Sequence, residues 1–398
     1  KLLIADEPTT ALDVTIQRQV LELMFDLQSK YKMGMLFITH DLGVIADIAD
    51  EVVVMYRSKV VEKNFTKEIF KNSQHPYTKG LLACRPSLDK NPKRLLTVSD
   101  FMTEDGKEKS VDLSQLTPYE KEYKFNEKEN PILLEVKNLK TFFPIKGGIF
   151  GKTIDYVKAV NGVSFKLRKG KTLGLVGESG CGKTTLGRSI LRLIEPTEGT
   201  VIYNGKYITA LNSDEMRQMR SKMQIIFQDP YSSLNPRMTI AEILMEPMII
   251  HKIGRNKAER VEKAKWLMDK VGLKPEQLSR YPHEFSGGQR QRISIARALS
   301  LNPEFIICDE SVSALDVSVQ AQVLNLLLEL QAEFGLTYIF ISHDLSVVNF
   351  IADEVGVMYA GEIVEMNTAN KIYHEPQMEY TKTLLKEIPK EIPKELML

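Results

Sequence analysis

Apolar residues along this chain of 398 residues fall into short runs bounded by charged or turn-forming residues, a pattern typical of strands that alternate with helices. Between residues 132 and 170, apolar and polar residues alternate, which predicts half-exposed strands. Other runs are almost continuously apolar and predict buried strands. These runs are Lys1–Ala5, Leu173–Val176, Phe305–Cys308 and Tyr338–Ile341. The expected fold class is therefore α/β.

The same sequence pattern occurs twice. Asp6–Asp13 recurs at Asp309–Asp316, an offset of 309 − 6 = 303 residues. The offset holds without a gap for further segments of the chain. These pairs are His40–Leu42 with His343–Leu345, Ala49–Val52 with Ala352–Val355, and Tyr77–Lys79 with Tyr380–Lys382. The chain is therefore expected to contain two copies of one domain.

The two copies are unequal. The sequence holds nothing before Lys1 that corresponds to residues 132–303, and it does not begin with Met, so we expect the first copy to be incomplete and truncated at its N-terminus. A small natural accessory domain is the less favoured alternative, because a buried parallel strand at Lys1–Ala5 needs neighbours on both sides. The expected organisation is a first, partial domain at 1–88, a linker at 89–130, a complete second domain at 131–373 and a C-terminal extension at 374–398. The linker is rich in mixed charge and favours a solvated spacer over a functional charged helix.

Composition narrows the function classes. The 53 Lys and Arg residues against 52 Asp and Glu residues give no electrostatic reason to expect nucleic-acid binding. No apolar run reaches the length of about 18 residues that a membrane span needs. Cys84, Cys181 and Cys308 lie far apart with no CxxC spacing, which argues against a metal site and a disulfide framework and fits a reducing compartment.

A phosphate-binding loop follows one of the apolar runs. Gly177–Thr184 fits the pattern GxxxxGK[ST], with a predicted strand before it and a predicted helix from about Lys183 to Leu193 after it. Glycines let the backbone wrap closely, so that its N–H groups and the positive end of the helix point at phosphate oxygens. Lys183 is expected to reach the β- and γ-phosphates, and the Thr184 hydroxyl to bind Mg²⁺. The plain alternative, a glycine turn, does not explain the flanking strand and helix.

A pair of acids ends another apolar run. Asp309 and Glu310 follow the strand at Phe305–Cys308. An acid at the carboxyl edge of a parallel sheet can hold Mg²⁺ through water, and its neighbour can orient or deprotonate the attacking water. A helix-capping acid pair is the alternative, which the presence of a P-loop in the same chain disfavours.

Further motifs lie at Gln228, Phe285–Gln289, Ser313–Asp316 and His343. They resemble, in this order, the Q-loop glutamine, the signature, the D-loop and the switch histidine of the ABC ATPases. The resemblance implies a P-loop NTPase fold with a RecA-like core, an antiparallel β subdomain and a helical signature subdomain, with the first copy incomplete.

The resemblance also implies ATP and Mg²⁺ as cofactors and assigns a role to each matching residue. The implied catalytic residues are Glu310, His343 and Gln228, and the implied Mg²⁺ ligands are Thr184, Gln228 and Asp309. The implied ATP-binding residues are Phe143, Gly177, Glu178, Ser179, Gly180, Cys181, Gly182, Lys183, Thr184 and Thr185, with Phe143 stacking on adenine or, equally, packing within a strand. The implied signature contacts to a partner's ATP come from Ser286, Gly287, Gly288 and Gln289, and the D-loop contact from Asp316. The truncated copy carries Asp6, Glu7, Asp13 and His40, which would serve a second site only in an intact parent chain.

Accessory residues point to a transport class. Gln228–Arg237 resembles the stretch after the Q-loop in dipeptide and oligopeptide importers, and His75–Leu82 resembles their C-terminal extension, echoed at Tyr380–Leu385. The resemblance implies an ATPase subunit peripheral to the cytoplasmic face of the cell membrane. Its implied partners are transmembrane permease subunits, a second ABC ATPase domain and, indirectly, an external solute-binding protein. Peptides, nickel complexes and glutathione are all compatible cargoes.

Two alternatives come from other classes. Paired ABC ATPases that act on ribosomes also have two domains and a charged linker, but their D-loop region usually reads Asn-His-Leu-Asp, whereas this chain has Thr10–Asp13 and Ser313–Asp316. A non-catalytic nucleotide-binding regulator would not need both Glu310 and His343.

Some peptide importers carry a cysteine cluster in the extension. Cys84 stands alone there, so no iron–sulfur centre is expected.

Overall fold

The structure is a computed structural model that describes residues 1–9, 14–86, 92–103, 105–111, 130–147, 152–313 and 315–386. The chain forms two compact units. The first unit comprises Lys1–Glu120, Ala314–Asn325 and Lys382–Leu398, and the second comprises Lys121–Ser313 and Leu326–Thr381. No helix in the described part of the chain has the length and apolar character needed to cross a membrane.

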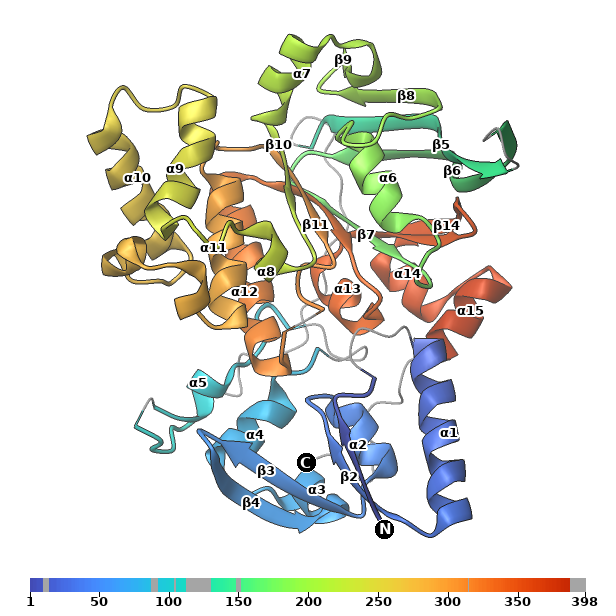
Figure 1. Cartoon of the computed structure of the whole chain (residues 1–398), viewed down its shortest axis with the longest axis vertical. Coiled ribbons are helices and arrows are strands. Elements are labelled where there is room, and N and C mark those ends of the chain that lie inside the picture. The colour runs from blue at the N-terminus through green and yellow to red at the C-terminus, as the bar shows by residue number, and fades with distance from the viewer. Residues whose placement is uncertain are drawn as a thin grey trace. The chain divides into compact units, whose positions relative to one another are not determined.

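Up to residue 48 strands and helices alternate, and a β-hairpin and three helices follow before residue 111 (Figure 1). They are β1 (Leu2–Asp6), α1 (Val14–Tyr31), β2 (Gly34–Ile38), α2 (Leu42–Ile48), β3 (Glu51–Tyr56), β4 (Lys59–Phe65), α3 (Thr66–Asn72), α4 (Pro76–Ala83) and α5 (Val98–Phe101).

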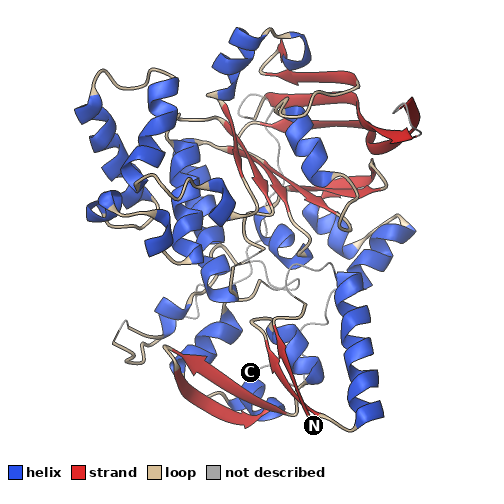
Figure 2. Ribbon diagram, in the orientation of Figure 1, coloured by secondary structure: helices blue, strands red, loops and turns tan. Residues whose placement is uncertain are grey.

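The elements from residue 130 onward include every strand of two larger sheets, drawn in red in Figure 2. Those before the signature region are β5 (Ile132–Gly147), β6 (Lys152–Arg168), β7 (Thr172–Val176), α6 (Lys183–Ile190), β8 (Glu198–Tyr203), β9 (Lys206–Tyr207), η2 (Ile208–Ala210), α7 (Ser213–Arg220) and β10 (Met223–Ile226). Helical segments follow as α8 (Pro230–Ser233), α9 (Ile240–Ile250), α10 (Lys257–Lys270), η3 (Pro275–Ser279), η4 (Pro282–Glu284) and α11 (Gly287–Leu299). The chain then forms β11 (Phe305–Asp309), α12 (Val317–Phe334), β12 (Thr337–Ile341), α13 (Leu345–Ile351), β13 (Glu354–Tyr359), β14 (Glu362–Thr368), α14 (Ala369–His374) and α15 (Glu379–Lys386).

The six-stranded sheet of the second unit sets the geometry of the site. Its order is β10-β11-β12-β7-β13-β14, and neighbouring strands are parallel except for the β13–β14 hairpin. Strands β7, β11 and β12 consist of buried residues, as the apolar runs predicted. Because the carboxyl ends of parallel strands share one edge, the loops that follow β7, β11 and β12 meet there.

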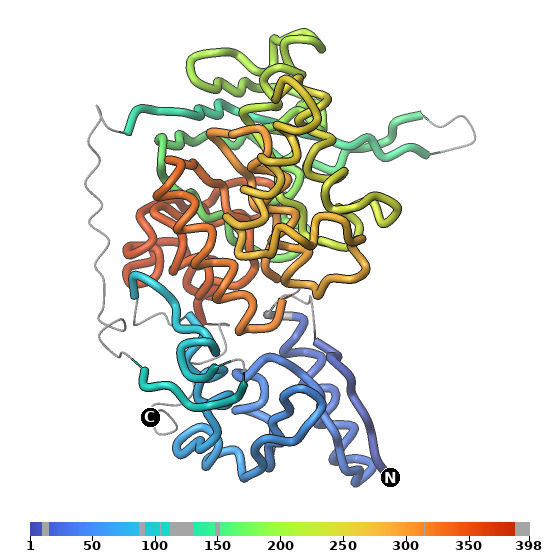
Figure 3. Tube along the Cα trace, turned by 90° about the vertical axis from the view of Figure 1, so that its left-hand side faces the viewer, coloured from blue at the N-terminus to red at the C-terminus, as the bar shows by residue number. Residues whose placement is uncertain are grey.

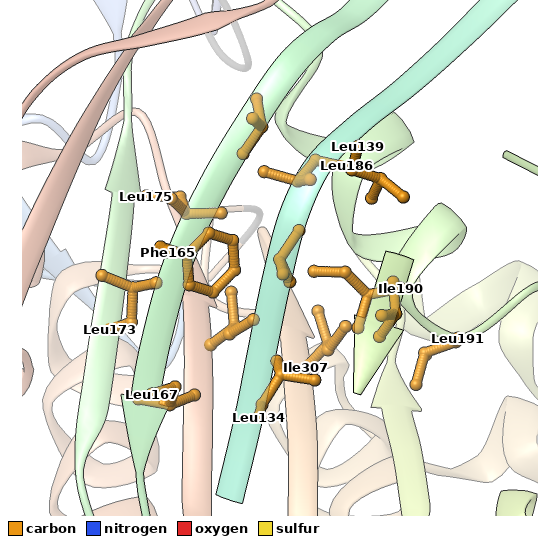
Figure 4. Close-up of a cluster of buried hydrophobic side chains, with 14 of the residues drawn as sticks. Leu134, Leu139, Phe165, Leu167, Leu173, Leu175, Leu186, Ile190, Leu191 and Ile307 are labelled. Atoms are coloured by element: carbon orange, nitrogen blue, oxygen red, sulfur yellow. The ribbon is translucent and has the colours of Figure 1, made fainter. Parts of the chain in front are cut away.

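An antiparallel sheet of order β6-β5-β8-β9 forms a second layer, and its segments run from teal to yellow-green along the tube in Figure 3. Helix α6 packs against β5 and β6 and also against β11 and β12. Leu134 and Leu139 of β5 gather with Leu186 and Ile190 of α6 in one buried cluster (Figure 4). Burial stabilises each such side chain by about 1.5–3 kcal/mol. Gly187 lets α6 lie close to the sheet, because a Cβ there would lie 3.3 Å from side-chain carbons of both Ile307 and Ile341.

The strand register confirms the repeat found in the sequence. Leu2 pairs with Gly34 as Phe305 pairs with Thr337, and both pairs are related by the offset of 303 residues. The β3–β4 hairpin even repeats the irregularity of β13–β14, between Val54 and Met55 in one and between Val357 and Met358 in the other.

The expectation that Lys1–Ala5 is a buried strand is wrong, although the segment does form a parallel strand. Leu2 is 65% exposed and Ile4 60%, whereas their counterparts Phe305 and Ile307 are 0% exposed. In the second unit β11 lies between β10 and β12, while among the described residues β1 pairs only with β2. The apolar side chains of β1 therefore lack the neighbours that bury its counterpart.

The expected solvated linker is wrong for its first part. Leu95 and Leu96 are buried, and α5 packs so closely on α4 that a Cβ on Gly80 would lie 3.0 Å from the Cα of Val98. The Asp100 carboxylate accepts from the N–H of Thr97 at 2.7 Å and so caps α5. The rest of the expected linker, residues 112–129, lies outside the described residues.

The helix predicted from Lys183 to about Leu193 ends earlier, at Ile190. Arg192 adopts a positive φ of 48°, and the N–H of Leu193 turns back to the carbonyl of Arg188 at 2.8 Å. A left-handed residue with a returning N–H is a common way to end a helix, and it is hard to foresee where that residue is not glycine.

Candidate nucleotide-binding site

The loop Gly177–Thr184 connects β7 to α6, as predicted. Gly177 and Gly182 have φ values of 143° and 108°, and an added Cβ would lie 2.1 Å from the carbonyl oxygen of Met358 or 2.0 Å from that of Ala159. Any side chain at these positions would push the loop off the strands behind it. Gly180, in contrast, has no heavy atom within 4 Å of the position of a Cβ, so its side of the loop is open. This geometry suits a backbone cradle for a phosphate group.

Lys183 is buried and directed back along the loop. Its Nζ donates to the carbonyl oxygens of Gly177 at 2.7 Å and Glu178 at 2.9 Å. Carbonyl oxygens compensate only part of the cost of burying an ammonium group, so Lys183 is poised to exchange them for an anionic ligand.

Thr184 and Asp309 meet as the sequence predicted. The Thr184 hydroxyl donates to Asp309 Oδ1 at 2.7 Å, and Arg188 Nη2 lies 3.8 Å from Asp309 Oδ2. Burial raises the pKa of Asp309, while the hydrogen bond from Thr184 and the charge of Arg188 act in the opposite direction. A threonine hydroxyl beside a carboxylate at the carboxyl edge of the sheet supplies the hard oxygen donors that Mg²⁺ prefers.

Glu310 is shared between two neighbours. Gln228 Nε2 donates to Glu310 Oε2 at 2.7 Å, and His343 Nδ1 lies 3.8 Å from the same oxygen. The His343 side chain, together with the Gln228 hydrogen bond, lowers the pKa of Glu310 despite its burial. In return the interaction with Glu310 raises the pKa of His343. The loops after β10, β11 and β12 thus bring together an anionic carboxylate, an amide and an imidazole beside the P-loop.

Backbone geometry around the acid is repeated in the first unit. Glu310 has a φ of 47° and its N–H donates to the carbonyl of Ile341 at 3.0 Å, while Glu7 has a φ of 45° and donates to Ile38 at 2.9 Å. His40 Nδ1 lies 3.2 Å from Glu7 Oε1. A positive φ in a non-glycine residue is uncommon and tends to mark functional sites. The first unit therefore reproduces the acid–histidine pair of the second. Asp6 ends β1, and Asp13 lies outside the described residues.

The signature residues lie at the start of α11. Ser286 is its N-cap and accepts from the N–H of Gln289 at 3.4 Å, while the Gln289 side chain accepts from the N–H of Ser286 at 3.0 Å. Among the described residues no hydrogen bond or ion pair joins Ser286–Gln289 to the P-loop. Asp316 precedes α12 and accepts from the N–H of Val319 at 2.9 Å. Phe143 lies on β5, opposite Val157 of β6, and is 40% exposed.

Sequence reasoning missed three neighbours of the loop. Arg188 could have been found from its helical spacing, since it lies four residues after Thr184 on α6. Gly361, in the turn between β13 and β14, donates its N–H to the carbonyl of Cys181 at 3.0 Å. The Tyr380 hydroxyl accepts from the N–H of Glu178 at 3.2 Å. The one sequence signal for Tyr380 was that a tyrosine, Tyr77, stands at the equivalent position of the first copy.

Strand, P-loop, helix and acid-bearing strand together define a P-loop nucleotide-binding domain. Residues 160–313 match the family described as "ABC transporter", and residues 61–104 and 364–397 match "Oligopeptide/dipeptide transporter, C-terminal region". The chain therefore carries an ABC transporter ATP-binding domain together with the C-terminal region of oligopeptide/dipeptide transporters. That region begins earlier than the expected boundary at 374, and in its first occurrence it extends past residue 88 to include α5.

Curated relatives agree with this assignment. The "Glutathione import ATP-binding protein GsiA" of Escherichia coli is 49% identical over 395 residues, covering 98% of this chain and 61% of the relative. The protein of the same name from Salmonella typhi is 49% identical over 393 residues with the same coverage. The chain thus spans less than two thirds of the length of these relatives.

Solved structures support the fold. A dimeric ATP-binding cassette in a post-hydrolysis state bound to ADP and Pi is 29% identical, with a TM-score of 0.54, over 60% of this chain and 99% of that one. The ADP conformation of an ATP-binding cassette of an ABC transporter is 27% identical, with a TM-score of 0.52, over 63% and 98%. The transporter C-terminal regions give no support to the alternative of a ribosome-acting ATPase.

Proposed function

We propose that this chain is the ATP-hydrolysing subunit, or part of it, that powers an ABC importer for dipeptides, oligopeptides or related small solutes. The observation that carries the proposal is the convergence of Thr184, Asp309, Glu310, Gln228 and His343 beside the P-loop at one edge of the parallel sheet. Glutathione, named in the relatives, is one such solute.

In the proposed mechanism the backbone N–H groups of Gly177–Thr185 and the N-terminus of α6 bind the phosphates. Lys183 exchanges its carbonyl partners for the β- and γ-phosphates, and Phe143 packs on the adenine. Thr184, Asp309 and Gln228 would hold Mg²⁺, which would supply charge neutralisation. Two of these donors fit the ion, because the Thr184 hydroxyl and the Asp309 carboxylate already lie 2.7 Å apart at the loop.

Glu310 is the residue we propose to orient the attacking water, and its lowered pKa keeps it anionic for that task. His343, held beside Glu310, donates to the γ-phosphate. Positioning and electrostatic stabilisation supply most of the rate in phosphoryl transfer, so these pre-arranged groups suffice.

A second ABC domain completes the working unit. Ser286, Gly287, Gly288 and Gln289 are placed at a helix N-terminus, where their N–H groups and capping hydroxyl suit a partner's ATP. Asp316 would contact the same partner. Asp6, Glu7, Asp13 and His40 would serve the corresponding second site of an intact pair. Transmembrane permease subunits, an external solute-binding protein and a location on the cytoplasmic face of the membrane complete the proposal.

The first test is ATP hydrolysis by the unchanged chain and by Glu310→Gln, with gel filtration of both in the presence of ATP. We expect hydrolysis to fall at least about a hundredfold, in line with the loss of a positioned general base, and the variant to dimerise with ATP. Glu195→Gln removes a surface carboxylate that pairs with Arg192 and should leave the rate unchanged. Full activity of Glu310→Gln would overturn the assigned role.

A second measurement separates importer from ribosome factor. In a cell extract, the chain should sediment with membranes that contain its permease subunits. Sedimentation with ribosomes, reversed by high salt, would contradict the transport role.

A further inference from the structure

A pair of tyrosines recurs in both halves of the repeat. Tyr359 and Tyr380 lie with ring centroids 4.5 Å apart, and Tyr56 and Tyr77, each 303 residues earlier, lie 4.4 Å apart. Tyr359 ends β13, and Tyr380 is on α15 in the C-terminal extension. Such contacts contribute about 0.5–1.5 kcal/mol beyond simple burial, so each pair can fix the extension on the hairpin beside it.

In the second unit this pair reaches the P-loop by two routes. The Tyr380 hydroxyl accepts from the N–H of Glu178, the second residue of the loop, at 3.2 Å. The hairpin that bears Tyr359 turns at Gly361, whose N–H donates to the carbonyl of Cys181 at 3.0 Å. The extension thus contacts the loop both directly and through the hairpin.

The peptide group between Gly177 and Glu178 is consequently held from two sides. Tyr380 accepts from its N–H at 3.2 Å, and Lys183 Nζ donates to its carbonyl oxygen, that of Gly177, at 2.7 Å. When Lys183 leaves for a phosphate, as proposed above, that second bond is lost and Tyr380 remains. The hydroxyl is neutral near pH 7, because burial and the nearby Glu178 charge raise the pKa of Tyr380 to about 12.

We propose that Tyr380 is a positioning residue for nucleotide binding: anchored on Tyr359, its hydroxyl fixes the peptide group between Gly177 and Glu178 and keeps the P-loop in its phosphate-binding shape. This inference rests on the proposed function of the loop and extends it to the C-terminal region, which thereby sets the affinity for ATP.

The repeat supplies a matched control. Tyr77 makes the same ring contact with Tyr56, but the described residues of the first unit include no GxxxxGK[ST] loop. Tyr373 is a second control, since its hydroxyl donates to the carbonyl of Leu345 at 2.5 Å, away from the loop. Phenylalanine at 380, 77 or 373 removes one hydroxyl and keeps the ring.

The decisive experiment compares Tyr380→Phe, Tyr77→Phe and Tyr373→Phe in the full chain. In nucleotide-free protein, amide hydrogen exchange of the segment Gly177–Gly182 should be faster in Tyr380→Phe alone. The Kd for ATP with Mg²⁺ should rise about 2- to 10-fold, the range expected for one lost hydrogen bond. The KM for ATP should rise in parallel, with kcat changed by less than about twofold, because the bond supports binding and not the chemical step.

Unchanged exchange and Kd in Tyr380→Phe would overturn the proposal, and so would equal changes in Tyr77→Phe. A lower melting temperature without faster P-loop exchange would also overturn it, by assigning Tyr380 to packing only. If the unchanged chain fails to bind ATP, the proposed function falls, while the exchange comparison still decides whether Tyr380 holds the loop.

Discussion

At the scale of single residues, Glu310 is central because two groups compete for one of its oxygens. Gln228 and His343 both approach Oε2, and each interaction lowers the pKa of the carboxyl group. The positive φ of Glu310 aims its side chain at this point, and Glu7 repeats the arrangement with His40. The acid and the histidine therefore form a coupled pair whose charge state depends on pH.

The titration of His343 tests this coupling. Its pKa is raised above the ordinary 6.5, mainly by Glu310 and against the effect of burial. Replacing Glu310 with Gln should therefore lower the pKa of His343, which an NMR titration of the imidazole protons measures, with His343→Gln to assign the signal. Glu195→Gln, at a surface ion pair, should leave that titration unchanged. An unshifted signal in Glu310→Gln would show that the pair is not coupled.

The free energy of unfolding should depend on pH through the same two groups, His343 and Glu310. The raised pKa of His343 contributes stability that is fully present below pH 6.5 and is lost as pH rises through the folded-state value. The lowered pKa of Glu310 contributes stability that is present above pH 4.5 and is lost as pH falls through its folded-state value. Glu310→Gln should therefore lower the free energy of unfolding most between pH 4.5 and pH 6.5, and less at pH 9.

At the scale of elements, the two hairpin turns show how close packing selects residues. Gly361 has a φ of 88°, and a Cβ there would lie 2.6 Å from the carbonyl oxygen of Lys158. Its counterpart Ser58 has a φ of 61° and accommodates a side chain. Two positive φ values in succession are typical of a tight hairpin turn, which favours glycine.

Opposite substitutions at these turns should therefore have opposite effects. Gly361→Ala should lower the free energy of unfolding by about 2 kcal/mol, since it adds left-handed strain to a steric clash, and should weaken ATP binding through Cys181. Ser58→Gly should raise it by up to about 1 kcal/mol, because it relieves strain without a clash. Denaturant unfolding measures the free energy of unfolding of each variant. Hydrogen exchange within each hairpin shows whether the change in stability arises there. A neutral Gly361→Ala would mean that the hairpin yields to the added methyl group.

Sequence alone predicted those elements whose own residue pattern determines their structure. Continuous apolar runs predicted β7, β11 and β12, and the offset of 303 residues predicted the repeated register. The exposure of Leu2 and Ile4 could not be predicted, because a strand's burial depends on neighbours that its own residues do not specify. The packing of α5 on α4 was hidden in a charged segment, where Leu95, Leu96 and Phe101 are buried apolar residues among many charges.

The site was predicted to a similar degree. Motif spacing identified Thr184, Asp309, Glu310 and His343, which the sheet edge indeed brings together. Tyr380 and Gly361 were not predicted, because both contact backbone groups of the P-loop. Every residue carries such backbone groups, so the residue types of the P-loop do not reveal these partners.

At the scale of the whole molecule, the two units differ in what they offer a nucleotide. The second has the P-loop, the acid pair and the histidine in one place, whereas the described part of the first has the acid and the histidine without a P-loop. A ligand stabilises only the folded state that binds it. ATP should therefore act unequally on the two units.

Thermal unfolding with ATP and Mg²⁺ should move one transition and leave the other in place. At a concentration of 100 times Kd, the bound nucleotide adds about 2.7 kcal/mol to the stability of the second unit. Hydrogen exchange assigns each transition, by following β7 and α6 in one unit and β3 and β4 in the other. Lys183→Met should abolish the shift, since it removes the cation that the phosphates would recruit, while Lys140→Met, which breaks a surface pair with Glu198, should retain it. If both transitions moved together in the unchanged chain, the first unit would share in binding the nucleotide, and its acid–histidine pair would have to be counted as part of a working site.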